Sequence, residues 1–258
     1  MLQYAIYFLK GIEMNCFKRL LTRVNPAVLI IIGLMLANNM LTSNQSFGGW
    51  LYEQILFLPG ILVGLTFHEA AHGYASYWLG DPTPKAQGRL SLNPFRHLDP
   101  IGFLALFFAG FGWGKPVEIN PLYYKNKRRD QLIVSLAGVI TNFVIAILAC
   151  LAMKFTLGYM GDHGWSFISQ TVLYIFNYML QVNIVLMAFN LLPVPPLDGF
   201  GVLTEIFNFQ KYDWYYKVYS NGLLILMLLI IFNVTDKILT PIVSNVYGFM
   251  FLNIIGIG

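Results

Sequence analysis

Two histidines and a glutamate lie inside an apolar run that is long enough to cross a membrane. The run extends from Ile55 to Leu79 and contains the stretch His68-Glu69-Ala70-Ala71-His72. A transmembrane helix needs about 20 predominantly apolar residues, so this run is typical of a membrane-spanning helix. Ionisable side chains at membrane depth are costly unless they bind something or face a hydrated cavity. The stretch therefore predicts a membrane protein with a polar site inside it.

The spacing of the two histidines predicts a metal site. Helix positions four residues apart lie about 40° from each other around the axis, so His68 and His72 can reach one ion. Neutral imidazoles at this spacing suit Zn²⁺, which lowers the pKa of a bound water to about 7. Glu69 lies beside the histidines and can take a proton from that water. This combination of residues is typical of metal-assisted hydrolysis.

The composition agrees with a membrane protein built as one domain. Of 258 residues, 57% are hydrophobic and 11% are charged, which is too little charge to coat a soluble domain. The length suffices for one bundle of about six transmembrane helices. We expect a single membrane-embedded domain over residues 1–258. Its parts are a core at about 50–210, an N-terminal surface segment and first span at 1–49, and C-terminal spans at 211–258.

The basic residues indicate how the chain crosses the membrane. We expect spans at 26–41, 54–79, 131–155 and 165–192, with a further crossing after Lys217. One side then receives 14 of the 16 Lys and Arg residues, and the positive-inside rule makes that side cytoplasmic. The N-terminus is expected on the same side. The net charge of +4 is therefore explained by topology, and the expected surroundings are a lipid bilayer and not a nucleic acid.

Residues 85–130 follow a different pattern. Arg89 to Asn93 alternates like a strand, and Lys115 to Asn120 reads as another. Between them, Ile101 to Trp113 is apolar but too short to span. We expect a small membrane-associated β-sheet with a re-entrant loop after the HExxH helix.

Asn142 and Asp198 are further polar candidates. Asn142 lies four residues after Gly138 on one helix face, where an interhelical hydrogen bond is the simpler interpretation. Asp198 follows the break Pro193-Val194-Pro195-Pro196-Leu197 and could merely cap the next helix. Against capping alone, a site with two histidines needs a third protein ligand. The expected topology also brings Asp198 to the same half of the membrane as the histidines.

The pair of motifs resembles the site-2 protease family of intramembrane zinc metalloproteases. The resemblance rests on HEAAH and on Asn190-Leu-Leu-Pro193-Val-Pro-Pro-Leu197-Asp198-Gly199, and it covers roughly residues 50–210. It implies that His68, His72 and Asp198 bind one zinc ion per chain, with Glu69 as general base and acid. The run Gly80 to Pro94 is similar to the compact bacterial and archaeal branch without a PDZ domain, where it corresponds to a membrane-embedded sheet. A prokaryotic cell membrane is the implied location.

The stretch Leu136 to Asn142 is similar to a further motif of that family, whose asparagine is placed near the active site. Val139 stands where proline is usual, but Asn142 is kept. The resemblance implies a catalytic role for Asn142, which could hold the substrate backbone or stabilise an oxyanion.

The expected function is hydrolysis of peptide bonds in or near the transmembrane segments of membrane-anchored proteins, as in regulated intramembrane proteolysis. The active site should face the cytoplasm, and the simplest substrate has a cytoplasmic N-terminus; assembly as a homo-oligomer stays open. Two alternatives remain, a catalytically silent binding protein of the same fold and a metal or ion transporter. A transporter would usually show internal repeats or several acidic residues along a path. A silent homologue should have lost Glu69 or a ligand, and the chain keeps all of them.

Overall fold

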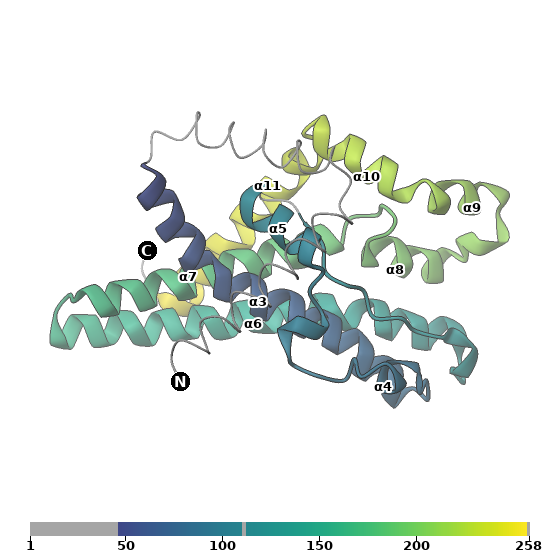
Figure 1. Ribbon diagram of the computed structural model, residues 1–258, viewed down its shortest axis with the longest axis horizontal. Coiled ribbons are helices and arrows are strands. Elements are labelled where there is room, and N and C mark those ends of the chain that lie inside the picture. Colours follow the sequence, from purple (N-terminus) through teal and green to yellow (C-terminus); the bar gives the residue numbers. More distant parts are fainter. Residues whose placement is uncertain (1–45, 110–111, 257–258) are drawn as a thin grey trace, which may run out of the picture. The chain divides into compact units, whose positions relative to one another are not determined.

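The computed structural model describes residues 46–109 and 112–256, and these are mainly helical (Figure 1). The described residues fall into two compact units, one with residues 46–50, 99–109 and 112–113, and the other with residues 51–98 and 114–256. The surface segment and the span at 26–41 that we expected lie outside the described residues.

Four helices of the described part are long and apolar enough to cross a membrane. They are α3 (Phe47–Trp78), α6 (Lys127–His163), α7 (Phe167–Asn190) and Val234–Ile255, which joins α11 (Val234–Met250) to the π-helix η4 (Phe251–Ile255). Two further helices, α9 (Asp213–Ser220) and α10 (Gly222–Ile231), are bent by 60° and would make a fifth span if they act as one. The chain is therefore a multi-pass membrane protein.

Short helices connect these long ones. They are α4 (Thr83–Ala86), η1 (Pro94–Arg96), α5 (Pro100–Ala109), η2 (Pro121–Tyr123), α8 (Asp198–Phe207) and η3 (Phe209–Lys211). Of these, α8 matters most for function, because it begins at Asp198 directly after the proline-rich break.

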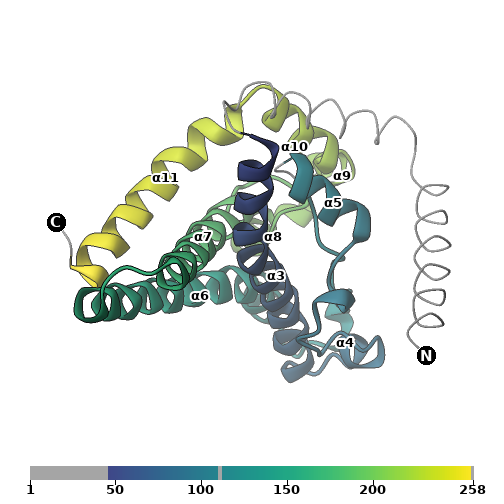
Figure 2. The same ribbon diagram turned by 60° about the vertical axis from the view of Figure 1, so that its left-hand side comes forward.

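Helices α6 and α7 form an antiparallel pair at the centre of the larger unit (Figure 2). Asn126 caps α6 by accepting a hydrogen bond from the backbone of Arg129 at 3.2 Å. Ser166 and Ser169 form a capping box at the start of α7. Apolar side chains of α6, α7, α11 and η4 then pack together, and the buried ones are Val139, Ala146, Ala149, Cys150, Met153, Leu180, Ile184, Met187, Met250 and Ile255.

Glycines let α3 lie close against α7. A Cβ atom at Gly60 would be 3.0 Å from Met179 Cα, and one at Gly64 would be 2.7 Å from Leu186 Cδ1. Small residues at such contacts are typical of helix packing in membranes. Because His68 follows Gly64 by one turn, this contact also fixes the depth of the first histidine in the bundle.

The predicted β-sheet was wrong. The described residues contain no sheet, and their one isolated bridge, between Leu98 and Gly114, lies outside both segments that were expected to form strands. The guanidinium of Arg89 donates to the carbonyls of Arg96 and Pro116, and so links the two segments through a side chain. Pro116 also removes an N–H donor that a ladder in the second segment would need. The expected re-entrant loop contains the ten-residue helix α5.

Candidate metal centre

The fold brings three potential metal ligands together. His68 and His72 project from the second half of α3, and Asp198 is the first residue of α8. The Nε2 atoms of the two histidines are 3.0 Å apart. Asp198 Oδ2 lies 3.2 Å from His68 Nε2 and 3.3 Å from His72 Nε2. Among the described residues, this is the group of His, Cys, Asp and Glu side chains arranged to hold an ion.

The three distances fit a zinc ion. Tetrahedral ligands with bonds of about 2.0 Å stand about 3.3 Å from one another, so these three atoms match one face of such a tetrahedron. Asp198 Oδ2 is buried and has no hydrogen-bond partner in the described structure. An oxygen buried beside two imidazole nitrogens, without a hydrogen bond, suits a cation that all three atoms can bind.

The remaining ring nitrogens are engaged by the protein. His72 Nδ1 lies 2.7 Å from the carbonyl oxygen of Val134, which can only accept, so Nδ1 carries the proton. His68 Nδ1 lies 2.6 Å from Asn142 Oδ1. Histidine ligands of metals commonly donate their second N–H in this way, which fixes the tautomer and the ring orientation. In His72, Nε2 is therefore free to bind a metal.

Helix α6 touches the histidines at Gly138. A Cβ atom there would lie 2.5 Å from His68 Cε1 and 2.6 Å from His72 Nε2. Gly138 and Asn142 do lie on one face, as predicted, and that face packs directly on the imidazoles.

Glu69 is held beside the cluster by an extended segment. Its Oε2 accepts a hydrogen bond from the backbone N–H of Val117 at 2.9 Å, and its side chain is half-buried. The segment is anchored in turn by the backbone of Lys115, which donates to His97 O at 2.7 Å. One carboxylate oxygen of Glu69 is thus fixed by the backbone, while the side chain stays partly exposed.

Asp198 faces the two imidazole rings of α3. The N-cap of α8 is Leu197, and no side chain caps that helix. Asp198 therefore contacts the two histidines, as a metal ligand would, and does not cap its helix.

Two other histidines stay outside the cluster. His97 is buried in the loop after η1, where its Nε2 lies 2.6 Å from Ser91 O. Burial lowers the pKa of His97 below its ordinary value, so its ring is neutral. His163 lies in the last turn of α6, and its ring stacks on Tyr159.

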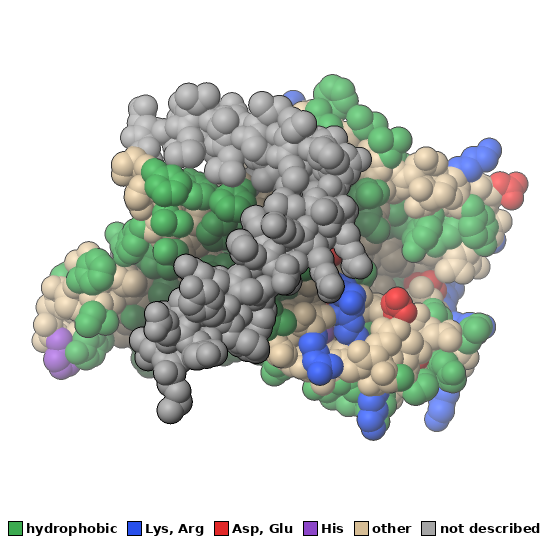
Figure 3. All heavy atoms as spheres, viewed as in Figure 1, with side chains coloured by type: hydrophobic (Ala, Val, Ile, Leu, Met, Phe, Trp, Pro, Cys, Tyr) green, Lys and Arg blue, Asp and Glu red, His purple; other side chains and the backbone are tan. Residues whose placement is uncertain are grey.

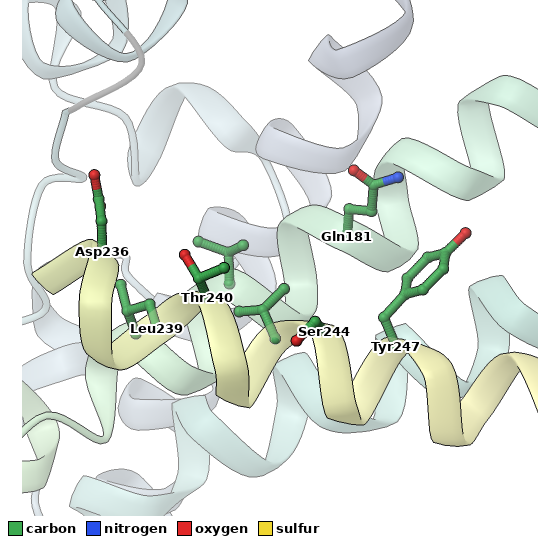
Figure 4. Close-up of a pocket in the computed structure, with 8 residues that line it drawn as sticks. Gln181, Asp236, Leu239, Thr240, Ser244 and Tyr247 are labelled. Atoms are coloured by element: carbon green, nitrogen blue, oxygen red, sulfur yellow. The ribbon is translucent and has the colours of Figure 1, made fainter.

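An open groove of about 460 Å³ lies between α7 and α11 (Figure 4). Gln181 and Val185 of α7 line it, together with polar residues of α11 such as Thr240 and Ser244. Each of the two α7 residues is two positions from Asn183, and so lies about 200° from it around the helix. The groove therefore lies on a different face of α7 from Asn183, whose side chain contacts Asn142 of α6.

Sequence reasoning missed the groups that hold the catalytic candidates. Two of them are backbone atoms, Val134 O and Val117 N, which carry no side-chain signal. The third is Asn183, whose Oδ1 accepts from Asn142 Nδ2 at 2.9 Å. Its position seven residues before Asn190 on one face of the helix was the available signal, but the sequence does not say which neighbour that face meets.

Comparison with known proteins adds independent findings. The model of peptidase family M50 matches residues 56–232, which is more than half of the chain. The chain is 37% identical over 161 residues to "Putative zinc metalloprotease YwhC" of Bacillus subtilis, covering 61% of this chain and 73% of that protein. It is 31% identical over 183 residues to "Putative zinc metalloprotease Rip2" of Mycolicibacterium smegmatis, covering 69% and 67%. No solved structure matches the chain significantly.

Proposed function

The chain belongs to peptidase family M50, and from this premise we propose that it cleaves membrane-anchored proteins in or near their transmembrane segments. It is a zinc metalloprotease and a multi-pass membrane protein. The observation that carries the intramembrane reaction is the position of the ligands. His68 and His72 lie within a 32-residue helix that is long and apolar enough to span the bilayer.

Each residue of the site has a defined task in this proposal. His68, His72 and Asp198 hold the zinc ion, which when bound polarises the scissile carbonyl and makes water a stronger nucleophile. Glu69 accepts a proton from the attacking water and passes it to the leaving nitrogen. The water oxygen bonds to the carbonyl carbon and the C–N bond breaks, which leaves a carboxylic acid and an amine.

We place the site toward the cytoplasmic half of the membrane. Positions 85–129 hold eight basic residues and positions 211–217 two more. In Figure 3 the Lys and Arg side chains on the visible face gather over the end of the larger unit that holds α4, α8 and α9. The positive-inside rule then orients that end to the cytoplasm. A single-pass substrate with a cytoplasmic N-terminus would present its cytoplasmic half to the zinc.

A Glu69→Gln variant tests the proposed reaction. The amide keeps the shape of the carboxylate and its contact with Val117 N, but it cannot accept the proton, so we expect proteolysis to fall by about a hundredfold or more. Zinc content should be unchanged, because Glu69 is not a ligand. The measurement compares membrane-protein fragments in cells that carry either form, followed by cleavage of an identified substrate by purified protein. Near-normal cleavage by the variant would remove Glu69 from the mechanism.

A further inference from the structure

A chain of buried amides links the backbone of α7 to His68. Asn183 Nδ2 donates to Met179 O at 2.8 Å. Asn142 Nδ2 donates to Asn183 Oδ1 at 2.9 Å and to Gly64 O at 3.2 Å. Asn142 Oδ1 then lies 2.6 Å from His68 Nδ1. Both asparagines have 0% of their surface exposed, so water does not compete for these bonds.

Two backbone carbonyls fix the direction of every bond in this chain. Gly64 O and Met179 O can only accept, so each asparagine must turn its nitrogen toward its carbonyl. Asn142 consequently faces His68 with its oxygen, which can only accept as well. The proton between them must therefore lie on His68 Nδ1, and the Nε2 lone pair is left for the cluster with His72 and Asp198.

We propose that Asn142 and Asn183 are positioning residues that hold His68 in the tautomer whose Nε2 binds zinc. This inference rests on the proposed function, because it concerns the same metal site. His72 receives the same tautomer directly from the Val134 carbonyl, whereas the corresponding partner of His68 is a side chain that itself needs orienting. Asn142 has both amide hydrogens engaged, so it acts through His68 and not through contact with a substrate.

The two asparagines should differ in strength and should not act independently. Asn142→Leu removes the acceptor of the His68 Nδ1 proton, and we expect zinc affinity to fall by about 10- to 100-fold. Asn183→Leu leaves Asn142 oriented by Gly64 O, so the loss should be smaller. In the double variant Asn183→Leu should add nothing, since its only route to the zinc passes through Asn142.

Zinc affinity is measured by competition with a chelator, using the purified full chain in detergent. Asn177→Leu is the matched control, because Asn177 lies on the same helix and its Oδ1 accepts a hydrogen bond from Tyr247 Oη, outside the chain of amides. That control should keep wild-type affinity. Unchanged affinity in Asn142→Leu, or losses that add in the double variant, would overturn the relay.

The tautomer itself can be observed without zinc or substrate. Metal-free protein labelled with ¹⁵N-histidine gives separate NMR signals for protonated and unprotonated ring nitrogens, and the His68→Ala variant identifies those of His68. We expect wild-type His68 to carry its proton on Nδ1 and Asn142→Leu to lose that preference. A wild-type proton on Nε2 would overturn the inference even if the variants fail to fold. The expected tautomer in a protein that binds no zinc would instead overturn the proposed function, and the zinc-binding role of the relay with it.

Discussion

Gly138 determines how close α6 can come to the two imidazoles. A Cβ atom would lie 2.5–2.7 Å from three atoms of His68 and His72, too close for atoms that are not bonded. We expect Gly138→Ala to push the rings from their present positions and to lower zinc affinity by about tenfold or more, as measured by chelator competition.

Gly158 offers the control on the same helix. It is exposed, and a Cβ there would meet nothing within 4 Å. Gly158→Ala should keep zinc affinity and raise the free energy of unfolding by up to about 1 kcal/mol, because alanine favours the helix. Equal zinc affinity in both alanine variants would contradict the role assigned to Gly138.

An alanine variant of Asp198 distinguishes two interpretations of this residue. If it is a ligand, Asp198→Ala leaves two histidines and an incomplete site, so zinc content should fall together with activity. If it served only as a cap, the loss would be about 1 kcal/mol of stability with zinc retained. Metal content and thermal unfolding of the purified variant distinguish the two outcomes. Full zinc content in Asp198→Ala would assign the third ligand elsewhere.

At the residue scale, helix periodicity predicted that the two histidines lie on one face. The i, i+4 spacing places His68 and His72 on one face whatever surrounds them, and the proline-rich break marks Asp198 as the start of a new helix. The structure brings these three together, as the sequence predicted. The contacts from Val134 O and Val117 N could not be predicted, because they depend on how separate segments pack. The catalytic role expected for Asn142 is not tested by the structure, and because both of its amide hydrogens are engaged we propose the positioning role in its place.

At the scale of elements, Asp81 ties the end of α3 to the segment that leads to η2. Its carboxylate accepts hydrogen bonds from Ser76 Oγ at 2.8 Å, from Thr83 N at 2.9 Å and from Asn120 N at 2.7 Å. Burial alone would raise the pKa of Asp81, but these donors together hold it below its ordinary value. Folding therefore favours the ionised form.

A depressed pKa gives a defined dependence of stability on pH. The contribution of Asp81 is fully present above its unfolded pKa of about 3.9 and is lost as the pH falls through the lower folded value. We expect Asp81→Asn to lower the free energy of unfolding by about 1–3 kcal/mol near pH 7, because the amide cannot accept from all three donors. The difference from wild type should shrink below about pH 4 in thermal unfolding measured against pH. The exposed Asp162→Asn serves as control, and a difference that persists unchanged in acid would contradict this account.

The failed sheet prediction also belongs to this scale. Alternation over five or six residues describes an extended chain, but it does not say whether the chain finds a neighbour. Here Val117 N in the extended segment donates to Glu69, and the guanidinium of Arg89 donates to backbone carbonyls. Short polar segments near a site are therefore predicted less well than the long helices.

For the whole molecule, the thickness of the bilayer made the spans predictable. An apolar run of about 20 residues must be helical in a membrane, because its backbone groups have no other partners there. The spans expected at 54–79, 131–155 and 165–192 correspond to α3, α6 and α7, although α3 and α6 begin earlier and α6 ends later than expected. The extension at the start of α6, Lys127 to Asp130, is charged, so a hydropathy criterion leaves it out.

A transmembrane substrate must unwind before this site can cut it, because each carbonyl of an intact helix is hydrogen-bonded within that helix. Replacing Ala by Gly near the cut lowers the stability of the substrate helix by about 1 kcal/mol per exchange, a factor of about five in the unwound fraction. We expect kcat/KM to rise by up to about fivefold per exchange, and a run of Leu and Ala to slow cleavage. The assay uses purified protein and substrate in lipid vesicles, with Glu69→Gln as the blank. The control carries the same exchanges at the far end of the transmembrane segment, where unwinding is not needed and the rate should not change. Equal rates for the two ends, with binding matched, would contradict the need for local unwinding and leave the zinc chemistry untouched.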